Sequence, residues 1–191
     1  MTTLRKLTTN DVQDLLKWEN DEVLQKLTLT PYNQLSESDI LSFFVENGGG
    51  RKCFGICQDC DDTLIGYTYL RDIDYDNRRA FIGKVIIGNK DYRDGTCVFE
   101  AVSKLLEYGF CDLNLNRIEG ACVEDHFFTP YMLQSFGFQK EGTFRQYIYK
   151  NGRYHNVMWY SLLRKDYNIL KEKGEYKIGK LVKRCVKLIK A

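Results

Sequence analysis

Between Val98 and Phe110, apolar residues recur with the period of an α-helix. They stand three or four positions apart, and charged residues fill the opposite side of the same pattern. The apolar positions are Val98, Ala101, Val102, Leu105, Leu106, Gly109 and Phe110. A helix with one apolar face must pack that face on another element, and strand-like runs precede and follow it along the chain. The segment therefore predicts a helix packed on a sheet.

The strand-like runs have a period of two, and turn-forming residues separate them. Asn151-Gly152 is the strongest signal for a two-residue hairpin. The expected strands are 4–7, 52–58, 63–71, 79–87, 117–124, 146–150 and 153–163. Further helices are expected after Thr9 or Asn10, from Ser36 or Ser38 to the Gly48–Gly50 run, and from Thr129-Pro130 to Gly137. This order predicts an α/β fold with a mixed, mostly antiparallel sheet of about seven strands and helices on both faces.

Length and composition fit one globular domain with a short appendage. The chain has 191 residues, of which 43% are hydrophobic and 28% charged, and this excludes disordered and collagen-like classes. No run approaches the ~18 apolar residues of a membrane span, and the N-terminus lacks the apolar core of a signal peptide. We therefore expect a cytoplasmic protein.

The seven cysteines are expected to be reduced thiols, because they are odd in number and no export signal precedes them. Cys53, Cys57 and Cys60 have a C-x3-C-x2-C spacing that also occurs in cluster-binding enzymes. Two of these cysteines fall at opposite ends of a predicted strand, and the third falls in a turn. We therefore expect no metal site.

The last residues form a basic tail. From Leu170 to Ala191 the chain has eight Lys or Arg and two Glu, so the rest of the chain is mildly acidic. An apolar stripe from Ile178 to Ile189, with basic residues from Lys177 to Lys190 on the opposite face, predicts an amphipathic helix of about 14 residues. This helix would dock on the body, form a homodimer or make weak contact with a membrane surface. Nucleic acid is not expected as a partner, because no aromatic residue stands on the basic face. We expect domain boundaries of 1–167 for the body and 168–191 for the tail.

Several local sequences, in their order and spacing, resemble the GCN5-related N-acetyltransferase (GNAT) superfamily, in the branch of the ribosomal-protein alanine and polyamine acetyltransferases. The resemblance runs from Leu4 to about Tyr167. The stretches that carry it are Leu64-Ile65-Gly66-Tyr67, Ala80-Phe81-Ile82-Gly83, Tyr92-Arg93, Glu100-Ala101, Leu113-Asn114-Leu115-Asn116-Arg117-Ile118, Gly137-Phe138-Gln139-Lys140-Glu141-Gly142, Lys150-Asn151-Gly152-Arg153-Tyr154 and Ser161-Leu162-Leu163-Arg164-Lys165-Asp166. It implies the acyl-CoA N-acyltransferase fold and an acyltransferase that moves an acetyl group from acetyl-CoA to an amine.

The resemblance also assigns the residues that hold acetyl-CoA. One strand would offer its backbone to the pantetheine arm, and the following loop would aim amides at the diphosphate from the start of the long helix. The residues implied are Val85, Ile86, Ile87, Arg93, Asp94, Gly95, Thr96, Cys97 and Val98. The loop is degenerate, because Thr96 and Val98 stand where the family has small residues.

Three further positions depart from the family. Phe81 stands where many relatives carry a glutamate that relays a proton, and Leu133 stands where many have a tyrosine that protonates the leaving thiolate. His126 aligns with an asparagine that is commonly found beside the pantetheine. The remaining candidates for proton transfer are His126, Glu124 and Tyr131, and the helical spacing turns Tyr131 away from the face of Leu133.

The acceptor is expected to be a primary amine of a small metabolite, an amino sugar or a protein N-terminus. Trp18-Glu19-Asn20-Asp21 resembles a pattern of amino-sugar and peptide N-terminal acetyltransferases, and with the loop 27–35 it would form the acceptor wall. The acidic body suits a cationic amine only loosely. Because several departures occur together, a non-catalytic GNAT-fold protein that binds a ligand or partner is the alternative.

Overall fold

The residues described by the computed structural model, 1–26, 28–29, 33–47, 50–93 and 95–190, form one sheet of seven strands. The strand order is β1-β2-β3-β4-β5-β7-β6, and every neighbouring pair is antiparallel except β4 and β5. The strands are β1 (Thr2–Lys6), β2 (Lys52–Gln58), β3 (Leu64–Asp74), β4 (Arg79–Ile87), β5 (Arg117–Val123), β6 (Gln139–Lys150) and β7 (Arg153–Leu163). The predicted mixed, mostly antiparallel sheet is confirmed.

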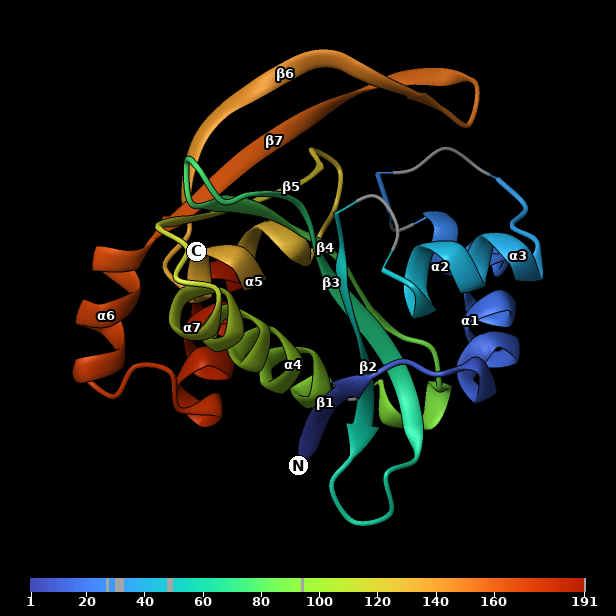
Figure 1. Cartoon of the computed structure of the whole chain (residues 1–191). Coiled ribbons are helices and arrows are strands. Elements are labelled where there is room, and N and C mark those ends of the chain that lie inside the picture. Colours follow the sequence, from blue (N-terminus) through green and yellow to red (C-terminus); the bar gives the residue numbers. More distant parts are fainter. Residues whose placement is uncertain (27, 30–32, 48–49, 94, 191) are drawn as a thin grey trace.

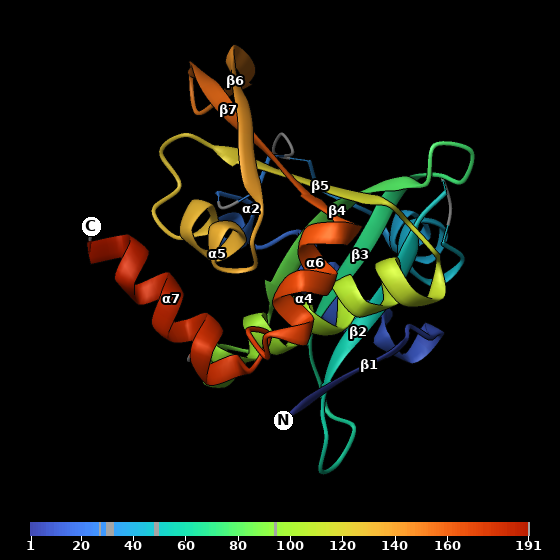
Figure 2. The same cartoon turned by 90° about the vertical axis from the view of Figure 1, so that its left-hand side faces the viewer.

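Helices cover both faces of this sheet (Figures 1 and 2). The helices α1, α2 and α3 lie on the face toward the right of Figure 1, and α4, α5 and α7 lie on the other face. The helices are α1 (Val12–Glu19), α2 (Glu22–Lys26), α3 (Glu37–Ile40), α4 (Thr96–Glu107), α5 (Thr129–Ser135), α6 (Arg164–Glu172) and α7 (Ile178–Lys190). The helix predicted from the apolar period of 98–110 is α4, which continues as a π-helical turn over Tyr108–Asp112.

Each face of the sheet has its own core. The larger core packs α4, α5 and α7 on residues such as Leu70, Ile82 and Ile118. On the other face, Trp18 of α1 and Phe44 pack on Tyr67, and the Trp18 and Tyr67 rings are stacked. Alternate residues of β3 point to opposite faces, so the strand contributes to both cores. The sheet is thus a rigid middle layer on which a site can be built.

β4 and β5 pair only at the start of each strand. The parallel ladder joins Arg79–Phe81 to Arg117–Glu119, and it ends there. Between Ile82 and Val85, β4 also carries a bulge, where one residue of β3, Tyr69, faces two of β4, Gly83 and Lys84. A bulge bends a strand and interrupts its pairing, and bulges are frequent beside active sites. The two strands therefore diverge toward their carboxyl ends and leave an opening in the middle of the sheet.

The structure differs from the sequence predictions at several element boundaries. β1 is Thr2–Lys6 rather than 4–7, because its register pairs Thr2 with Gln58. β6 begins at Gln139 rather than 146, since irregular pairing between Phe144 and Ile148 hides its alternation. The helices α2 and α6 were not predicted. The three strands from Lys52 to Ile87 form the predicted antiparallel meander.

The β6–β7 hairpin arches over the sheet toward the side of α2 (Figure 1). Its turn is the predicted one, and Asn151 and Gly152 both have positive φ, at 53° and 76°. Beside the turn, Lys150 is 6% exposed, and its ammonium donates to the backbone oxygens of Gln25 and Thr28. The tip of the hairpin is therefore fastened to α2 and the residues after it.

The C-terminal helix packs on the body through the inner half of its apolar stripe. Leu181 and Cys185 are buried in the larger core, whereas Val186 and Ile189 near the end of the helix are exposed. Arg184 donates to the Ser135 oxygen and pairs with Glu175. Of the alternatives for the tail, docking on the body is the one observed. Among the described residues, no helix has the length and apolarity needed to cross a membrane.

Candidate active site

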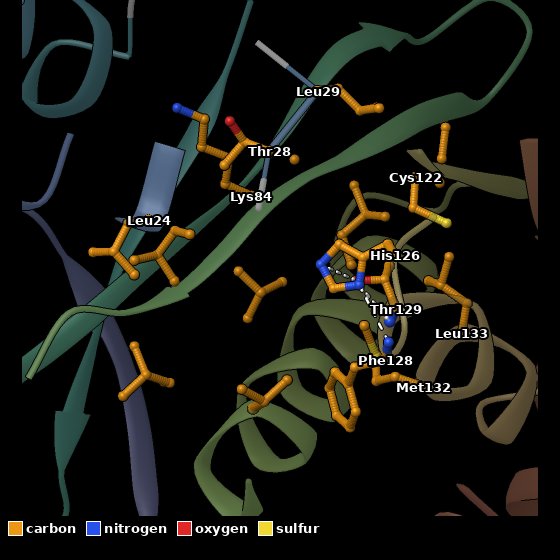
Figure 3. Close-up of a pocket in the computed structure, with 18 of the residues that line it drawn as sticks. Leu24, Thr28, Leu29, Lys84, Cys122, His126, Phe128, Thr129, Met132 and Leu133 are labelled. Atoms are coloured by element: carbon orange, nitrogen blue, oxygen red, sulfur yellow. Dashed lines mark hydrogen bonds between the residues drawn. The ribbon is translucent and has the colours of Figure 1, made fainter. Parts of the chain in front are cut away.

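The opening between β4 and β5 leads into a cavity of about 450 Å³. Its walls are β4, the start of α4, the end of β5, α5 and the segment around α2, and they are mostly apolar. In Figure 3, Leu24, Thr28, Leu29 and Lys84 lie on one side of the cavity, and His126, Phe128, Met132 and Leu133 lie on the other. A concave, largely apolar cavity with a few polar groups is typical of small-molecule sites.

Most of the residues assigned to acetyl-CoA come together here. The cavity is lined by Val85, Ile86, Ile87, Arg93, Gly95 and Val98. Thr96 and Cys97 do not line it: Thr96 is exposed in the first turn of α4, and Cys97 is buried against Ile87 and Ala101. Asp94 lies outside the described residues.

The loop before α4 is shaped by Gly95 and Arg93. Gly95 is the N-cap of α4 and takes a left-handed conformation, with φ of 89°. A Cβ atom at this position would meet no atom within 4 Å, so the glycine is there for its backbone conformation and leaves open space in front of the helix. Arg93 donates from Nε to the Ile87 oxygen at 2.8 Å and from Nη2 to the Gly88 oxygen at 2.9 Å. The guanidinium thus fixes the end of β4 beside the positive end of the α4 dipole.

His126 lines the cavity and also caps α5. Its Nδ1 accepts from the backbone amides of Phe128 at 3.3 Å and Thr129 at 3.1 Å (Figure 3). The sequence favours Thr129 as the cap, with Pro130 at the first helical position. This assignment is wrong, because the helix begins at Thr129 and the histidine ring supplies the acceptor. A neutral imidazole that accepts at Nδ1 carries its proton on Nε2, which lies 3.3 Å from Thr129 Oγ1. Burial lowers the pKa of His126, which also favours the neutral ring.

We expect His126→Ala to lower the free energy of unfolding by about 1 kcal/mol at pH 8, the usual contribution of a helix cap. The folded-state pKa of His126 lies below the unfolded value of about 6.5, so the wild type should lose this contribution as the pH falls below 6.5. Urea unfolding at pH 8 and pH 5.5 would measure the difference. His126→Asn, whose side-chain oxygen can accept hydrogen bonds from the same amides, should recover most of the loss. If wild type and His126→Ala differ as much at pH 5.5 as at pH 8, His126 does not cap α5 as a neutral imidazole.

The other two candidates for proton transfer lie outside the cavity. Glu124 is exposed and its Oε2 accepts from Asn156 Nδ2 at 2.8 Å. Tyr131 is partly buried against the larger core and does not line the cavity. Leu133 itself lines the cavity. Of the three candidates, the structure brings only His126 into the cavity.

Phe81 lies in the cavity wall, at the position where the family resemblance leads us to expect glutamate. Its side chain is buried against the Trp159 ring at 5.1 Å, and the Arg71 guanidinium stands 4.1 Å from the Phe81 ring centroid. Arg71 also pairs with Asp72. This part of the wall is therefore aromatic and cationic rather than acidic.

The Trp18-Glu19-Asn20-Asp21 motif does not line the cavity itself, but it contacts the segment around α2 that does. Asn20 forms two hydrogen bonds with the backbone of Leu35, and Asp21 Oδ1 accepts from the first amides of α2. Glu19 is buried, and its carboxylate accepts from the hydroxyl of Tyr67 and from the ammonium of Lys84. The motif therefore holds the segment around α2 in place. Its one buried carboxylate, that of Glu19, already accepts hydrogen bonds from Tyr67 and Lys84.

Sequence reasoning missed the pair between Lys84 and Glu19. The Lys84 Nζ to Glu19 Oε2 distance is 2.7 Å, and the two side chains are 13% and 5% exposed. A signal was present, because Lys84 interrupts the apolar run of β4, and a lysine is rarely buried without a partner. The lining contributed by Gly120, Ala121 and Cys122 was also missed.

The cysteine trio does not form a cluster. Cys53 and Cys57 are buried, and Cys60 is exposed in the turn after β2. Burial raises the pKa of Cys53 to about 12 and that of Cys57 to about 11, which disfavours the thiolate form that binds metals. Within the described part of the chain, no group of three or more potential ligands is placed to hold a metal ion.

Comparison with known proteins identifies the family to which this chain belongs. Residues 4–159, most of the chain, match the family model described as "Acetyltransferase (GNAT) domain". The N-acetyltransferase p20 of Bacillus licheniformis, whose function is uncharacterised, is 35% identical over 86% of this chain and 94% of its own length. The putative ribosomal N-acetyltransferase YdaF of Bacillus subtilis (strain 168) is 32% identical over 56% of this chain and 57% of its own.

A solved structure shares the fold. The spermidine N-acetyltransferase of Vibrio cholerae, in complex with CoA and spermine, aligns with a TM-score of 0.78 and 22% identity. The alignment covers 87% of this chain and 98% of that one. At this identity the likeness concerns the arrangement of helices and strands.

Proposed function

Since the chain belongs to the GNAT acetyltransferase family, we propose that the gap between β4 and β5 holds acetyl-CoA and that the acceptor is the primary amine of a small metabolite, an amino sugar or a protein N-terminus. The protein is an acetyl-CoA-dependent N-acetyltransferase. The observation that carries the proposal is the cavity at the divergence of β4 and β5, with the start of α4 at its edge. The non-catalytic alternative is not favoured, because the relatives are N-acetyltransferases.

The residues present fit the cofactor. Val85, Ile86 and Ile87 would run along the pantetheine arm, and their edge toward β5 lies beyond the end of the β4–β5 ladder. Gly95 leaves room for a phosphate before α4, and Arg93 adds a positive charge at that point. We propose that Gly95 takes over the turn that the family makes one residue later. The roles predicted for Asp94, Thr96, Cys97 and Val98 in holding the cofactor stay predictions.

Bound acetyl-CoA supplies a thioester that an unprotonated amine can attack. The chain contributes proximity and orientation, because its cavity walls bring two molecules together and exclude water. His126 Nδ1 already accepts two amides, and Glu124 and Tyr131 do not line the cavity. The catalytic roles predicted for these three residues stay predictions. We propose that the amine loses its proton to water at the cavity mouth before the attack.

The test is acetylation of a panel of amines. Free thiol release from acetyl-CoA should require an amine, and mass spectrometry should find the acetylated product. Without a general base in the cavity, kcat/KM should rise about tenfold per pH unit until the pH reaches the acceptor's own amine pKa. A profile that levels off well below that pKa would reveal a base in the enzyme. Thiol release that no amine accelerates would contradict the proposal.

The predicted division into 1–167 and 168–191, the homodimer and the membrane contact remain predictions. The packing of Leu181 and Cys185 in the larger core supports a tail that belongs to the body. The exposed Val186 and Ile189 at the end of α7 are the apolar groups that a second copy or a lipid surface would contact.

A further inference from the structure

The cavity wall is cationic although most of the chain is mildly acidic. Its charged lining residues are Arg71, Lys84 and Arg93, and no aspartate or glutamate is found among the described residues that line it. Glu19 lies behind Lys84, where it is 5% exposed and bound by Lys84 and Tyr67. The acceptor therefore meets no available carboxylate in this wall, so the ammonium groups of a polycation would be left unpaired.

A second, smaller recess of about 200 Å³ adjoins the cavity, and the two share His126 and Phe127. α2, the end of β5 and the tip of the β6–β7 hairpin surround this recess. Its charged or titratable lining residues are Lys26, Asp125, His126, Lys150, Arg153 and His155. Three of these side chains are cationic and one is a carboxylate, so the recess has a net positive charge even with both histidines neutral.

Contacts across its wall hold the recess in place. Lys150 donates to the Thr28 oxygen at 2.9 Å and to the Gln25 oxygen, which keeps the hairpin tip against α2. Burial lowers the pKa of Lys150, the effect expected when positive charge is held in a poorly solvated site. The one carboxylate, Asp125, is bound by Arg153 at 3.0 Å and lies 3.7 Å from His155 Nδ1.

We propose that the acceptor of this enzyme carries an oxyanion, a carboxylate or a phosphate, that binds in the recess lined by Lys26 and Arg153 while its amine faces the cavity. The inference rests on the proposed function and adds the charge of the acceptor to it. Lysine and arginine bind oxyanions through charge-assisted hydrogen bonds. Lys26 and Arg153 are both exposed, so an acceptor can reach them from solvent. Polycationic amines should be poor acceptors.

The experiment compares acceptors that differ only in the anion. The pairs are O-phosphoethanolamine with ethanolamine, and the dipeptide Ala-Glu with Ala-Gln; spermidine is the polycation. We expect the anionic member of at least one pair to have a kcat/KM about tenfold or more above its neutral partner, with spermidine lowest. The first pair tests phosphate and the second tests carboxylate.

The matched variants separate recognition from folding. Lys26→Gln combined with Arg153→Gln should bring the anionic-to-neutral ratio close to one. Lys17→Gln combined with Arg145→Gln removes two exposed cations from α1 and from the same hairpin, outside the recess, and should leave the ratio unchanged. A ratio that survives in the first variant, or spermidine as the best acceptor, would overturn the inference.

The outcomes also distinguish this inference from the proposed function. Acetylation of neutral amines without any preference for the anion would overturn the inference alone. Absence of turnover with every acceptor, together with no change in thermal stability on adding acetyl-CoA, would overturn the proposed function as well.

Discussion

Replacing Glu19 by alanine is expected to lower the free energy of unfolding by about 3–5 kcal/mol, the cost of removing one partner from a buried ion pair. The substitution leaves the Lys84 ammonium, on a side chain that is 13% exposed, without its carboxylate. It also removes the acceptor of the Tyr67 hydroxyl, which is fully buried beneath α1. Urea unfolding followed by circular dichroism would measure the loss.

A double-mutant cycle of Glu19 and Lys84 shows whether the loss of stability comes from leaving a buried charge without its partner. Lys84→Met alone should also destabilise, because among the described residues it leaves the buried Glu19 carboxylate with Tyr67 as its one remaining donor. The double variant Glu19→Leu with Lys84→Met should recover most of the loss, since a well-packed apolar pair can replace a buried ion pair at little cost. Glu19→Gln is the milder variant if Glu19→Ala does not fold. A loss below about 1 kcal/mol for Glu19→Ala would mean that the pair is solvated.

Arg93→Ala is expected to weaken acetyl-CoA binding about 10- to 100-fold. The guanidinium holds the Ile87 and Gly88 oxygens and leaves its charge beside the start of α4. A hydrogen bond from a charged group contributes about 1.5–3 kcal/mol, and each 1.4 kcal/mol is about tenfold in Kd. Isothermal titration with acetyl-CoA would measure the change.

The matched control is Lys90→Ala, which removes an exposed cation from the same turn. Its effect should be less than threefold, because an exposed charge at this distance is screened by solvent and salt. Equal losses in the two variants would mean that Arg93 acts only through net charge. An unchanged Kd in Arg93→Ala would contradict its assignment to the cofactor site.

The sequence predicted the fold where local patterns are strong. The meander from Lys52 to Ile87, the helix α4 and the Asn151-Gly152 turn follow from periodicity and turn chemistry within a few residues. α2 has five residues and is too short to show an apolar period, and the amide of Val23 near its start depends on Asp21 for its acceptor. The first half of β6 was missed because Gly142 and an irregular register remove its alternation.

The candidate site, too, could be predicted only in part. Family resemblance located the cofactor strand and loop, but it could not predict which side chains meet across the chain. Lys84 and Glu19 are 65 residues apart, and Lys150 and Gln25 are 125 apart. The cap that His126 supplies to α5 was hidden because histidine is an uncommon capping residue. These contacts decide the charge of the cavity, whereas the chain outside its basic tail is mildly acidic.

Thermal unfolding of the purified protein with and without millimolar acetyl-CoA tests most directly whether the cavity between β4 and β5 holds the acetyl donor. A ligand at about 100 times its Kd adds ~2.7 kcal/mol, so the midpoint should rise by several degrees, and the rise should be much smaller in Arg93→Ala. A folded wild-type protein whose midpoint does not move would show that the loop around Gly95 no longer holds the cofactor, and it would contradict the account.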